Sequence, residues 1–362
     1  MSELPGLRAQ IDGLDDELLR LLNARAQVSR RIGEVKRRED PGAAIYRAER
    51  EAVVLRRLEG ANPGPLPPEA VSRIFHEIMS ASSALQRAIR VAYLGPAGTF
   101  SEAAAVRQFG RSAVAVPCAN FDEAFRRTET GETDFSVVPV ENSTEGTISR
   151  VLDLLLNSPL KVCAEVVLRV QQNLMRKRAG TDGIARIVSH AQSLAQTQNW
   201  LNRHLPGVTR VPVESNAEAA RLASLDASVA AIAGANAAEN FGLEIIAPSI
   251  EDDPTNRTRF MVVGHGDAQP SGRDRTWLVM SAPNVAGGLI KLLAPFAAHG
   301  VSMTKIESRP ARLASMPGSW EYMFYVDVEG HRDDAGVAAA LGELKSIAPY
   351  LKVFGSYPVG DY

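Results

Sequence analysis

Apolar residues at the start of the chain recur at alternating steps of four and three. They are Leu7, Ile11, Leu14, Leu18, Leu21, Val28, Ile32 and Val35. This spacing is typical of a helix that packs along another helix through a heptad seam. It predicts one helix over residues 7–38, roughly 45 to 50 Å long. A domain of about 90 residues cannot cover such a helix, so the pattern predicts a dimer.

One position of this seam carries a charge. Arg25 falls between two apolar seam residues, and Lys36 lies three helical turns later on nearly the same face. An unpaired buried guanidinium costs on the order of several kcal/mol. Glu51 or Asp15 could pair with Arg25 inside a bundle. Two cations on one inner face favour an anionic ligand between the helices instead.

Two further helices are expected, over residues 45–58 and 69–87, on either side of the Pro- and Gly-rich segment 62–68. Polar residues recur on them where a core would be apolar: Arg47, Arg50, Glu51, Ser82 and Gln86. The first domain, residues 1–90, is therefore predicted to be all-helical with a polar interior.

From residue 91 onward, short apolar runs alternate with helical patterns. Strands are expected at 91–94, 114–116, 135–140, 187–189, 208–213 and 230–233. Helices are expected after the Gly-rich loop 95–101, near 122–130, from 192, near 217–223 and near 236–241. The alternation predicts an α/β domain, residues 91–266, with largely parallel sheets. Its last strand, 260–263, could return to the first lobe.

Three polar clusters lie at the ends of expected strands. They are residues 141–146, residues 189–192 together with Gln196, and Thr258-Arg259 directly before the strand 260–263. Open α/β sheets bind ligands at the carboxyl ends of their strands, so the clusters are expected to converge on one cleft between two lobes. His190 alone would more often be structural. An Arg pair beside an edge strand is the plainer interpretation of the third cluster.

The last segment, residues 273–362, predicts strand, helix, two strands, helix and strand. The expected elements are 276–281, 287–298, 301–308, 322–328, 334–344 and 353–357. This order is the ferredoxin-like α+β unit. A purely structural domain remains open, because this fold serves many functions.

Composition limits the classes of protein. A chain of 362 residues with a net charge of −2 is long for one core and gives no sign of a nucleic-acid or membrane partner. Neither a signal peptide nor a spanning apolar stretch is visible, which predicts a cytoplasmic protein. Cys118 and Cys163 are the only cysteines, so both are expected to be reduced packing residues. No metal or cofactor is expected.

The polar residues of the first domain, in their order over three helices, resemble the all-helical chorismate mutase family. The resemblance implies that Arg8 of a partner chain and Arg25 bind the carboxylates of chorismate. Lys36 and Gln86 would donate to the ether oxygen, and Glu51 would hold the ring hydroxyl. Arg47, Arg50 and Ser82 complete the implied substrate site, although some members carry an acid at position 47. A Claisen rearrangement needs only a compact dianion and donors to that oxygen, which these residues supply.

The second region resembles prephenate dehydratase through its three clusters and the loop 95–101. Thr258 is implied as the catalytic hydroxyl, and whether Thr258 or Glu141 donates the proton stays open. Arg259 is implied as a partner for a substrate carboxylate. The other implied site residues are Thr99, Asn142, Ser143, Ser189 and Gln196. Ala191 and Thr197 replace the more frequent Pro and Cys.

Two stretches of the last domain resemble the phenylalanine-sensing segments of ACT domains. They are Gly287-Gly288-Leu289 and Glu307-Ser308-Arg309-Pro310, and the family more often has Ala at position 288. The combined prediction is a homo-oligomeric, bifunctional chorismate mutase and prephenate dehydratase of phenylalanine biosynthesis, inhibited by phenylalanine. Truncation after about residue 272 is expected to remove that inhibition if the chain stays folded. The alternatives are a non-catalytic amino-acid sensor and a dehydratase that prefers arogenate.

Overall fold

The computed structural model describes residues 3–39, 46–282, 285–310 and 322–360. The chain divides into two compact units. The first, called the helical unit, contains Met1–Ile89 and Phe109–Val114, and the second contains Arg90–Gln108 and Ala115–Tyr362.

Three helices build the helical unit: α1 (Leu4–Glu39), α2 (Ala48–Gly60) and α3 (Pro68–Ala84). Proline suits the first turn of α3 because the N–H it lacks would be unpaired there. The expected start of the second helix at residue 45 lies outside the described residues. The third helix ends at Ala84, three residues earlier than expected, so Gln86 belongs to the turn that follows.

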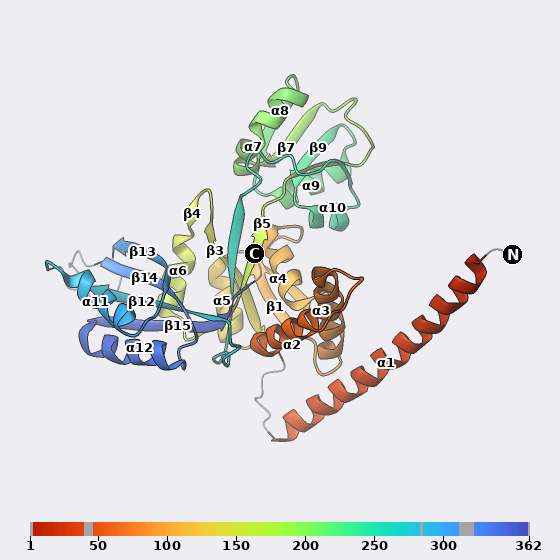
Figure 1. Cartoon of the computed structure of the whole chain (residues 1–362). Coiled ribbons are helices and arrows are strands. Elements are labelled where there is room, and N and C mark those ends of the chain that lie inside the picture. The colour runs from red at the N-terminus through yellow and green to blue at the C-terminus, as the bar shows by residue number, and fades with distance from the viewer. Residues whose placement is uncertain (1–2, 40–45, 283–284, 311–321, 361–362) are drawn as a thin grey trace. The chain divides into compact units, whose positions relative to one another are not determined.

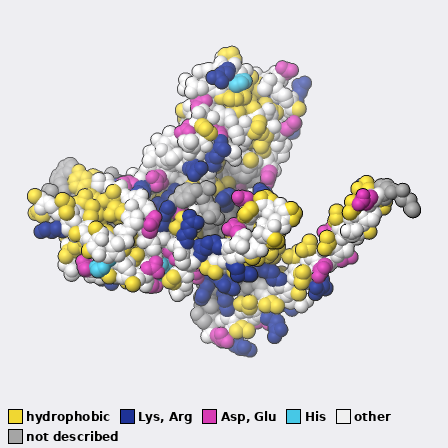
Figure 2. All heavy atoms as spheres, viewed as in Figure 1, with side chains coloured by type: hydrophobic (Ala, Val, Ile, Leu, Met, Phe, Trp, Pro, Cys, Tyr) yellow, Lys and Arg dark blue, Asp and Glu magenta, His cyan; other side chains and the backbone are white. Residues whose placement is uncertain are grey.

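Helix α1 carries two different stripes. All eight apolar seam residues are exposed in the single chain, and apolar side chains run along the helix surface in Figure 2. A second stripe, Arg25, Ser29, Gly33 and Lys36, is at least partly buried. These residues recur at helical spacing, and the first three contact the segment from α3 to Gln86. Arg25 therefore belongs to the polar stripe and not to the apolar seam.

The first lobe of the second unit is a mixed sheet with strand order β2-β1-β3-β11-β5, and β4 pairs with β3. Its strands are β1 (Arg90–Leu94), β2 (Val114–Cys118), β3 (Phe135–Asn142), β4 (Gly146–Thr147), β5 (Lys161–Arg169) and β11 (Arg257–Gly264). Its helices are α4 (Phe100–Phe109), α5 (Phe121–Glu129) and α6 (Ser149–Asn157).

The second lobe is a sheet with strand order β10-β6-β9-β7-β8. Its strands are β6 (Asn173–Arg176), β7 (Arg186–His190), β8 (Thr209–Val213), β9 (Val229–Ala233) and β10 (Glu244–Ala247). Its helices are α7 (Ala191–Gln196), α8 (Gln198–His204), α9 (Asn216–Leu225) and α10 (Ala235–Phe241). Every residue of β9 is buried, as a continuous run of small and apolar residues predicts for a central strand.

The expectation of largely parallel sheets was wrong. β11 runs antiparallel to both β3 and β5, and β6 runs antiparallel to β9 and β10. Parallel pairing joins β1 to β3, and β7 to both β8 and β9. The chain leaves the first lobe after β5 and returns to it through β11. Because β11 comes back from the second lobe, it runs in the direction opposite to β3 and β5. In the same way β6, which enters the second lobe, runs opposite to β9. The predicted return of residues 260–263 to the first lobe is confirmed.

The C-terminal domain has the predicted order of strands and helices. It contains β12 (Asp274–Ala282), α11 (Gly288–Ala298), β13 (Met303–Pro310), β14 (Tyr322–Glu329), α12 (Ala335–Ile347) and β15 (Tyr350–Pro358). The sheet order is β13-β14-β12-β15, and all its pairs are antiparallel. Helices α11 and α12 pack against each other (Figure 1). This arrangement is the ferredoxin-like fold.

One apolar core joins the first lobe to the C-terminal domain. Buried Val138 and Met261 of the lobe belong to the same cluster as Trp277, Tyr325 and Phe354 of the domain. Strand β15 also crosses β5 closely, because a Cβ on Gly355 would meet the backbone oxygen of Val162 at 2.0 Å. The lobe and the domain therefore fold as parts of one compact unit.

Candidate functional site

The polar stripe of α1 meets the end of α3 through a network of hydrogen bonds. The Arg25 guanidinium donates to Ser82 Oγ at 2.7 Å. Gln86 Nε2 donates to Ser29 Oγ at 2.9 Å, and Ser29 Oγ donates to the Ser82 carbonyl at 3.2 Å. The structure thus brings Arg25, Ser82 and Gln86 together. Ser29 was not predicted, although its place one turn after Arg25 could have pointed to it.

Lys36 lies farther along the same stripe. Burial lowers the pKa of its ammonium, the Arg47 charge lowers it further, and Glu49 opposes both. Gln86 Oε1 is buried and has no hydrogen-bond partner among the described residues. Gly33 makes room for Gln86, since a Cβ there would come within 2.8 Å of its Cγ. The Lys36 ammonium, in a partly buried polar site, suits a small anionic ligand, and the unpaired Gln86 Oε1 can accept from a donor on that ligand.

The other four predicted residues of the helical unit lie in different surroundings. Glu51 Oε1 lies 2.5 Å from Nδ1 of His76, a partner that sequence reasoning missed. Arg8 is exposed near the start of α1. It is separated from Lys36 by 28 residues of continuous helix, which is about 42 Å of rise. Arg8 cannot reach Lys36 of its own chain. Arg47 and Arg50 are exposed at the start of α2.

In the second unit, a buried group that we call the hydroxyl cluster joins β3 and β11. It consists of Asn142, Asn256 and Thr258. Asn142 Nδ2 donates to Thr258 Oγ1 at 2.9 Å and to Asn256 Oδ1 at 3.0 Å. Asn142 Oδ1 accepts from two backbone amides of the following turn, which fixes the amide orientation. Because Thr258 Oγ1 accepts from Asn142, its own proton remains available to donate.

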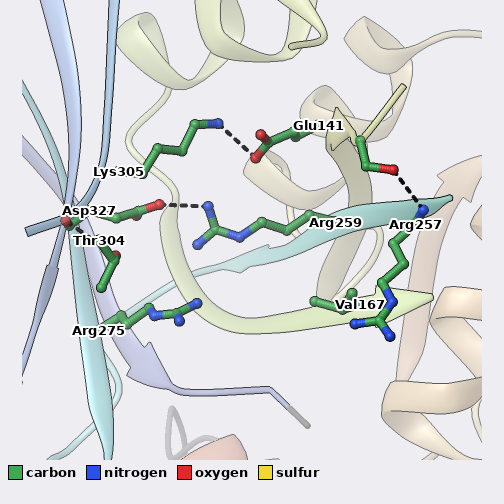
Figure 3. Close-up of a pocket in the computed structure, with 9 residues that line it drawn as sticks. Glu141, Val167, Arg257, Arg259, Arg275, Thr304, Lys305 and Asp327 are labelled. Carbon is green, nitrogen blue, oxygen red and sulfur yellow. Dashed lines mark hydrogen bonds and ion pairs between the residues drawn. The ribbon is translucent and has the colours of Figure 1, made fainter. Parts of the chain in front are cut away.

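The residues next to Asn142 and Thr258 in sequence, Glu141 and Arg259, point to the opposite face of the strand pair. Asn142 lies opposite Thr258, and Glu141 lies opposite Arg259. Because successive side chains of a strand face opposite sides, Glu141 and Arg259 leave the hydroxyl cluster and face the C-terminal domain. Lys305 Nζ donates to Glu141 at 2.7 Å. Figure 3 shows Arg259 directed toward Asp327 and Lys305 directed toward Glu141. These residues were expected to share one cleft. They form two sites instead, on opposite faces of the strand pair β3 and β11.

The second of these sites is a cavity of about 400 Å³, called the interdomain pocket. Its lining residues are Glu141, Ser143, Val167, Arg257, Arg259, Arg275, Thr304, Lys305 and Asp327. Arg259 is largely buried there, and protein groups contact its nitrogens: Glu165 at 2.7 Å, Asp327 at 2.6 Å and Tyr357 at 2.8 Å. Two protein carboxylates thus stand where the sequence predicted a substrate carboxylate.

The predicted residues of the second lobe lie among buried polar groups. Ser189 Oγ is 2.6 Å from the Ile232 carbonyl and 3.0 Å from Asn216 Oδ1. Gln172 Nε2 donates to Gln196 Oε1 at 3.3 Å. Gln172 Oε1 and Gln196 Nε2 are buried without partners among the described residues. These two amides can accept from and donate to a ligand.

Thr99 helps to join the two lobes. Its hydroxyl donates to the Leu94 carbonyl at 3.1 Å and accepts from the Glu102 amide at 3.4 Å, which caps the start of α4. Asn236 Nδ2 of α10 donates to the Thr99 carbonyl at 2.9 Å, and Asn240 Nδ2 donates to Glu102 at 2.8 Å. The hydroxyl and the carbonyl of Thr99 are thus both bonded to protein groups at this contact.

The two predicted effector stretches lie in different surroundings. Gly287 has a φ of 76° immediately before α11, a conformation that favours glycine. Gly288 is buried, and Leu289 is half-buried. Glu307 accepts from Thr147 of the first lobe, and Arg309 lies 3.8 Å from Asp153. Ser308 and Pro310 lie on β13, opposite Phe324 and Tyr322.

Comparison with known proteins identifies these parts. The family models Chorismate mutase type II, Prephenate dehydratase and ACT domain match residues 7–87, 91–268 and 276–346. A bifunctional chorismate mutase/prephenate dehydratase of Neisseria gonorrhoeae is 51% identical over 354 residues, which cover 97% of this chain and 96% of that protein. The chain belongs to the bifunctional chorismate mutase/prephenate dehydratase family.

Other members and structures agree. A Pseudomonas aeruginosa member of this bifunctional family is 43% identical, with 98% of both chains covered. The crystal structure of an Arthrobacter aurescens prephenate dehydratase in complex with L-Phe is 34% identical, with a TM-score of 0.67. It covers 75% of this chain and 90% of that one. Both enzymatic domains of the family are present here, and the predicted fold of all three parts is confirmed.

The described residues contain neither a membrane-spanning helix nor a cluster of metal ligands. None of the helices in the described ranges is both long and apolar enough to span a membrane. The same ranges hold no group of three or more His, Cys, Asp or Glu residues suited to a metal ion. Cys118 and Cys163 are both free thiols, and Cys118 is buried.

Proposed function

We propose that this chain rearranges chorismate to prephenate and then converts prephenate to phenylpyruvate, as an isomerase and a lyase of phenylalanine biosynthesis. The full-length similarity to bifunctional relatives is the observation that carries the proposal. We assign the first reaction to residues 1–90, the second to residues 91–266 and regulation to residues 273–362. A cytoplasmic location and reactions without a cofactor fit these activities.

For the first reaction, we assign carboxylate binding to Arg25 and donation toward the ether oxygen to Lys36 and Gln86. The C–O bond breaks while a C–C bond forms, and negative charge gathers on the oxygen without any proton transfer. Donors held in place before the reaction stabilise that charge most effectively. We assign Glu51, positioned by His76, to the ring hydroxyl, with Arg47, Arg50 and Ser82 completing the substrate site.

We propose that the active form is a homodimer or a larger assembly formed along α1. The eight exposed apolar residues of its seam support this, because a soluble monomer rarely leaves such a stripe uncovered. An antiparallel partner helix would bring its own Arg8 toward the Lys36 end of α1. That arrangement would supply the second carboxylate ligand, which Arg8 of the same chain cannot.

For the second reaction, we assign the hydroxyl of Thr258 as the group that assists the departing oxygen. The carboxylate leaves as carbon dioxide, its bonding electrons enter the ring, and the ring hydroxyl departs with a proton as water. Asn142 orients the Thr258 hydroxyl, whereas Glu141 is paired with Lys305 on the opposite face. We therefore favour Thr258 over Glu141 as the proton donor. Substrate binding is assigned to Thr99, Asn142, Ser143, Ser189 and Gln196.

We further propose inhibition by phenylalanine at the C-terminal domain. The Arthrobacter aurescens relative was crystallised with L-Phe, and the turn before α11 can present backbone N–H groups to a carboxylate. The proposed contacts are Gly287, Gly288, Leu289, Glu307, Ser308, Arg309 and Pro310. Contacts of Glu307 and Arg309 with the first lobe would let the domain influence the dehydratase.

The test is to supply chorismate to the purified chain and to measure phenylpyruvate by its ultraviolet absorbance in alkali. We expect phenylpyruvate from the parent chain and accumulated prephenate from Thr258→Val, which keeps the β-branched shape and removes the hydroxyl. Ligand binding without turnover would favour the sensor. Faster turnover of arogenate than of prephenate would favour the other dehydratase.

A further inference from the structure

The strand pair that carries the hydroxyl cluster is irregular at one point. Arg259 lies opposite Glu141, but Phe260 lies opposite Pro139, so Val140 is an extra residue in β3. Such a bulge interrupts the ladder and bends the strand, and bulges are frequent beside active sites. Pro139 also lacks an N–H to donate. The bulge therefore interrupts the pairing of β11 with β3 beside Arg259, whereas β5 pairs with residues 257–262 of β11 without a break on the other side.

Side chains from the C-terminal domain hold the same strand ends from the opposite face. One terminal nitrogen of Arg259 donates to Asp327 of the C-terminal domain at 2.6 Å, while its Nε donates to Glu165 of β5 in the first lobe. The other terminal nitrogen donates to the Tyr357 hydroxyl, which in turn donates to Asp327 at 3.1 Å. Figure 3 shows Arg259 reaching from β11 toward Asp327, and Lys305 reaching Glu141 of β3. Both strands are thus tied to one domain.

The charges around Arg259 balance one another. Arg275 also pairs with Glu165, at 3.1 Å, so two guanidiniums face two buried carboxylates. Burial alone would lower the pKa of Arg259, but Tyr357, Asp327 and Glu165 together raise it well above its ordinary value. Removal of a single carboxylate would leave an unbalanced buried cation, which a strand cannot hold in the same place.

We propose that Asp327 is a positioning residue for the dehydration step, acting through Arg259 to fix the end of β11 and so the hydroxyl of Thr258. The proposal rests on the proposed function of Thr258. Arg259 and Thr258 are consecutive, so a shift in the guanidinium moves the backbone that carries the hydroxyl. The C-terminal domain is then part of the dehydratase machinery in addition to any regulatory role.

The first test is Asp327→Asn in the full-length chain, which keeps the shape and removes the charge. We expect the dehydratase kcat to fall by about 20-fold or more while KM for prephenate changes less than about threefold, because orientation and not binding is lost. The mutase kcat of the same preparation should not change. Asp267→Asn is the matched control, since it removes a carboxylate that pairs with Arg332 of the C-terminal domain at 2.7 Å. Its dehydratase kcat should stay within about twofold of the parent value.

The second test asks whether Asp327 acts through Arg259. The double variant Arg259→Gln with Asp327→Asn removes one cation and one carboxylate together. Glu165 stays paired with Arg275, so no buried charge is left without a partner. If one residue acts through the other, the double variant should be no slower than the slower single variant. Tyr357→Phe, which removes a single oxygen, should lower kcat by about 3- to 10-fold and serves if Asp327→Asn does not fold.

Two results would overturn the proposal: a parental kcat in Asp327→Asn, or losses that multiply in the double variant. If Asp327→Asn does not fold, a parental kcat in Tyr357→Phe overturns it. A parent chain that does not convert prephenate would instead contradict the proposed function.

Discussion

The helical unit exposes a large apolar surface, whereas the C-terminal domain buries its largest apolar side chains. Helix α1 leaves a full heptad seam exposed, with Leu14 at 61% exposure. The C-terminal domain instead buries Trp277, Tyr325 and Phe354 in a core that it shares with the first lobe. The second surface is completed within its own chain, whereas the first is the surface along which we propose that two chains associate. The C-terminal domain is thus packed into the dehydratase, and the helical unit leaves its apolar seam open to a partner.

The largest effect should come from truncation after Gly272. The sequence alone suggested an active enzyme insensitive to phenylalanine, but the shared core now predicts a chain that does not fold, because Val138 and Met261 would lose their apolar cover. Soluble yield and near-ultraviolet circular dichroism check this. A soluble, active truncated enzyme would show that the first lobe does not depend on the domain.

A charge in the seam of α1 should have the next largest effect. Leu18→Glu should yield a folded chain of smaller assembled mass whose mutase kcat/KM is lower by about 100-fold or more, since the partner's cation is lost. Sedimentation and both activity assays measure this. Leu225→Glu, at an exposed site on α9, is the control and should change neither property. Unchanged mass in Leu18→Glu would contradict assembly through α1.

Gly355→Ala tests the contact between β15 and β5. The added Cβ would overlap the Val162 carbonyl, so the free energy of unfolding of the second unit should fall by about 1–3 kcal/mol or more. Gly342→Ala is the control, because it adds a methyl group to α12 with nothing within 4 Å. That change should stabilise the helix by up to about 1 kcal/mol. Denaturant unfolding of both variants decides whether the close crossing matters.

The smallest effect concerns pH and the amide of Gln86. In Gln86→Glu the carboxyl group donates only when it is protonated, so mutase activity should rise as pH falls toward its pKa. The parent amide donates at every pH. The pH dependence of kcat/KM for both proteins measures the difference. Identical profiles would remove Gln86 from the mutase site.

Local patterns predicted most of the elements and the division of the chain into its three folds. The heptad spacing predicted α1, and the succession of apolar runs and helical patterns predicted the order of strands and helices in the C-terminal domain. Residues close in sequence were harder to separate. Glu141 and Asn142 looked like one polar cluster, but the alternation of β3 sends them to opposite faces, as it does for Thr258 and Arg259.

The remaining partners could not be predicted because they are distant in sequence. Asp327 meets Arg259 across 68 positions, and His76 meets Glu51 across 25. No local periodicity specifies such pairs, since they arise only when separate elements pack together. The shared core could not be predicted for the same reason, because strands of the first lobe and of the C-terminal domain, far apart in sequence, contribute to one cluster.

The central claim is that one chain holds two separate active sites, one in each compact unit. It is tested most directly by measuring both reactions in Lys36→Ala and Thr258→Val. Lys36→Ala should lower the mutase kcat by about 100- to 1,000-fold and leave the dehydratase at its parental rate with added prephenate. Thr258→Val should do the reverse. Loss of both activities in either well-folded variant, or of neither, would contradict the account.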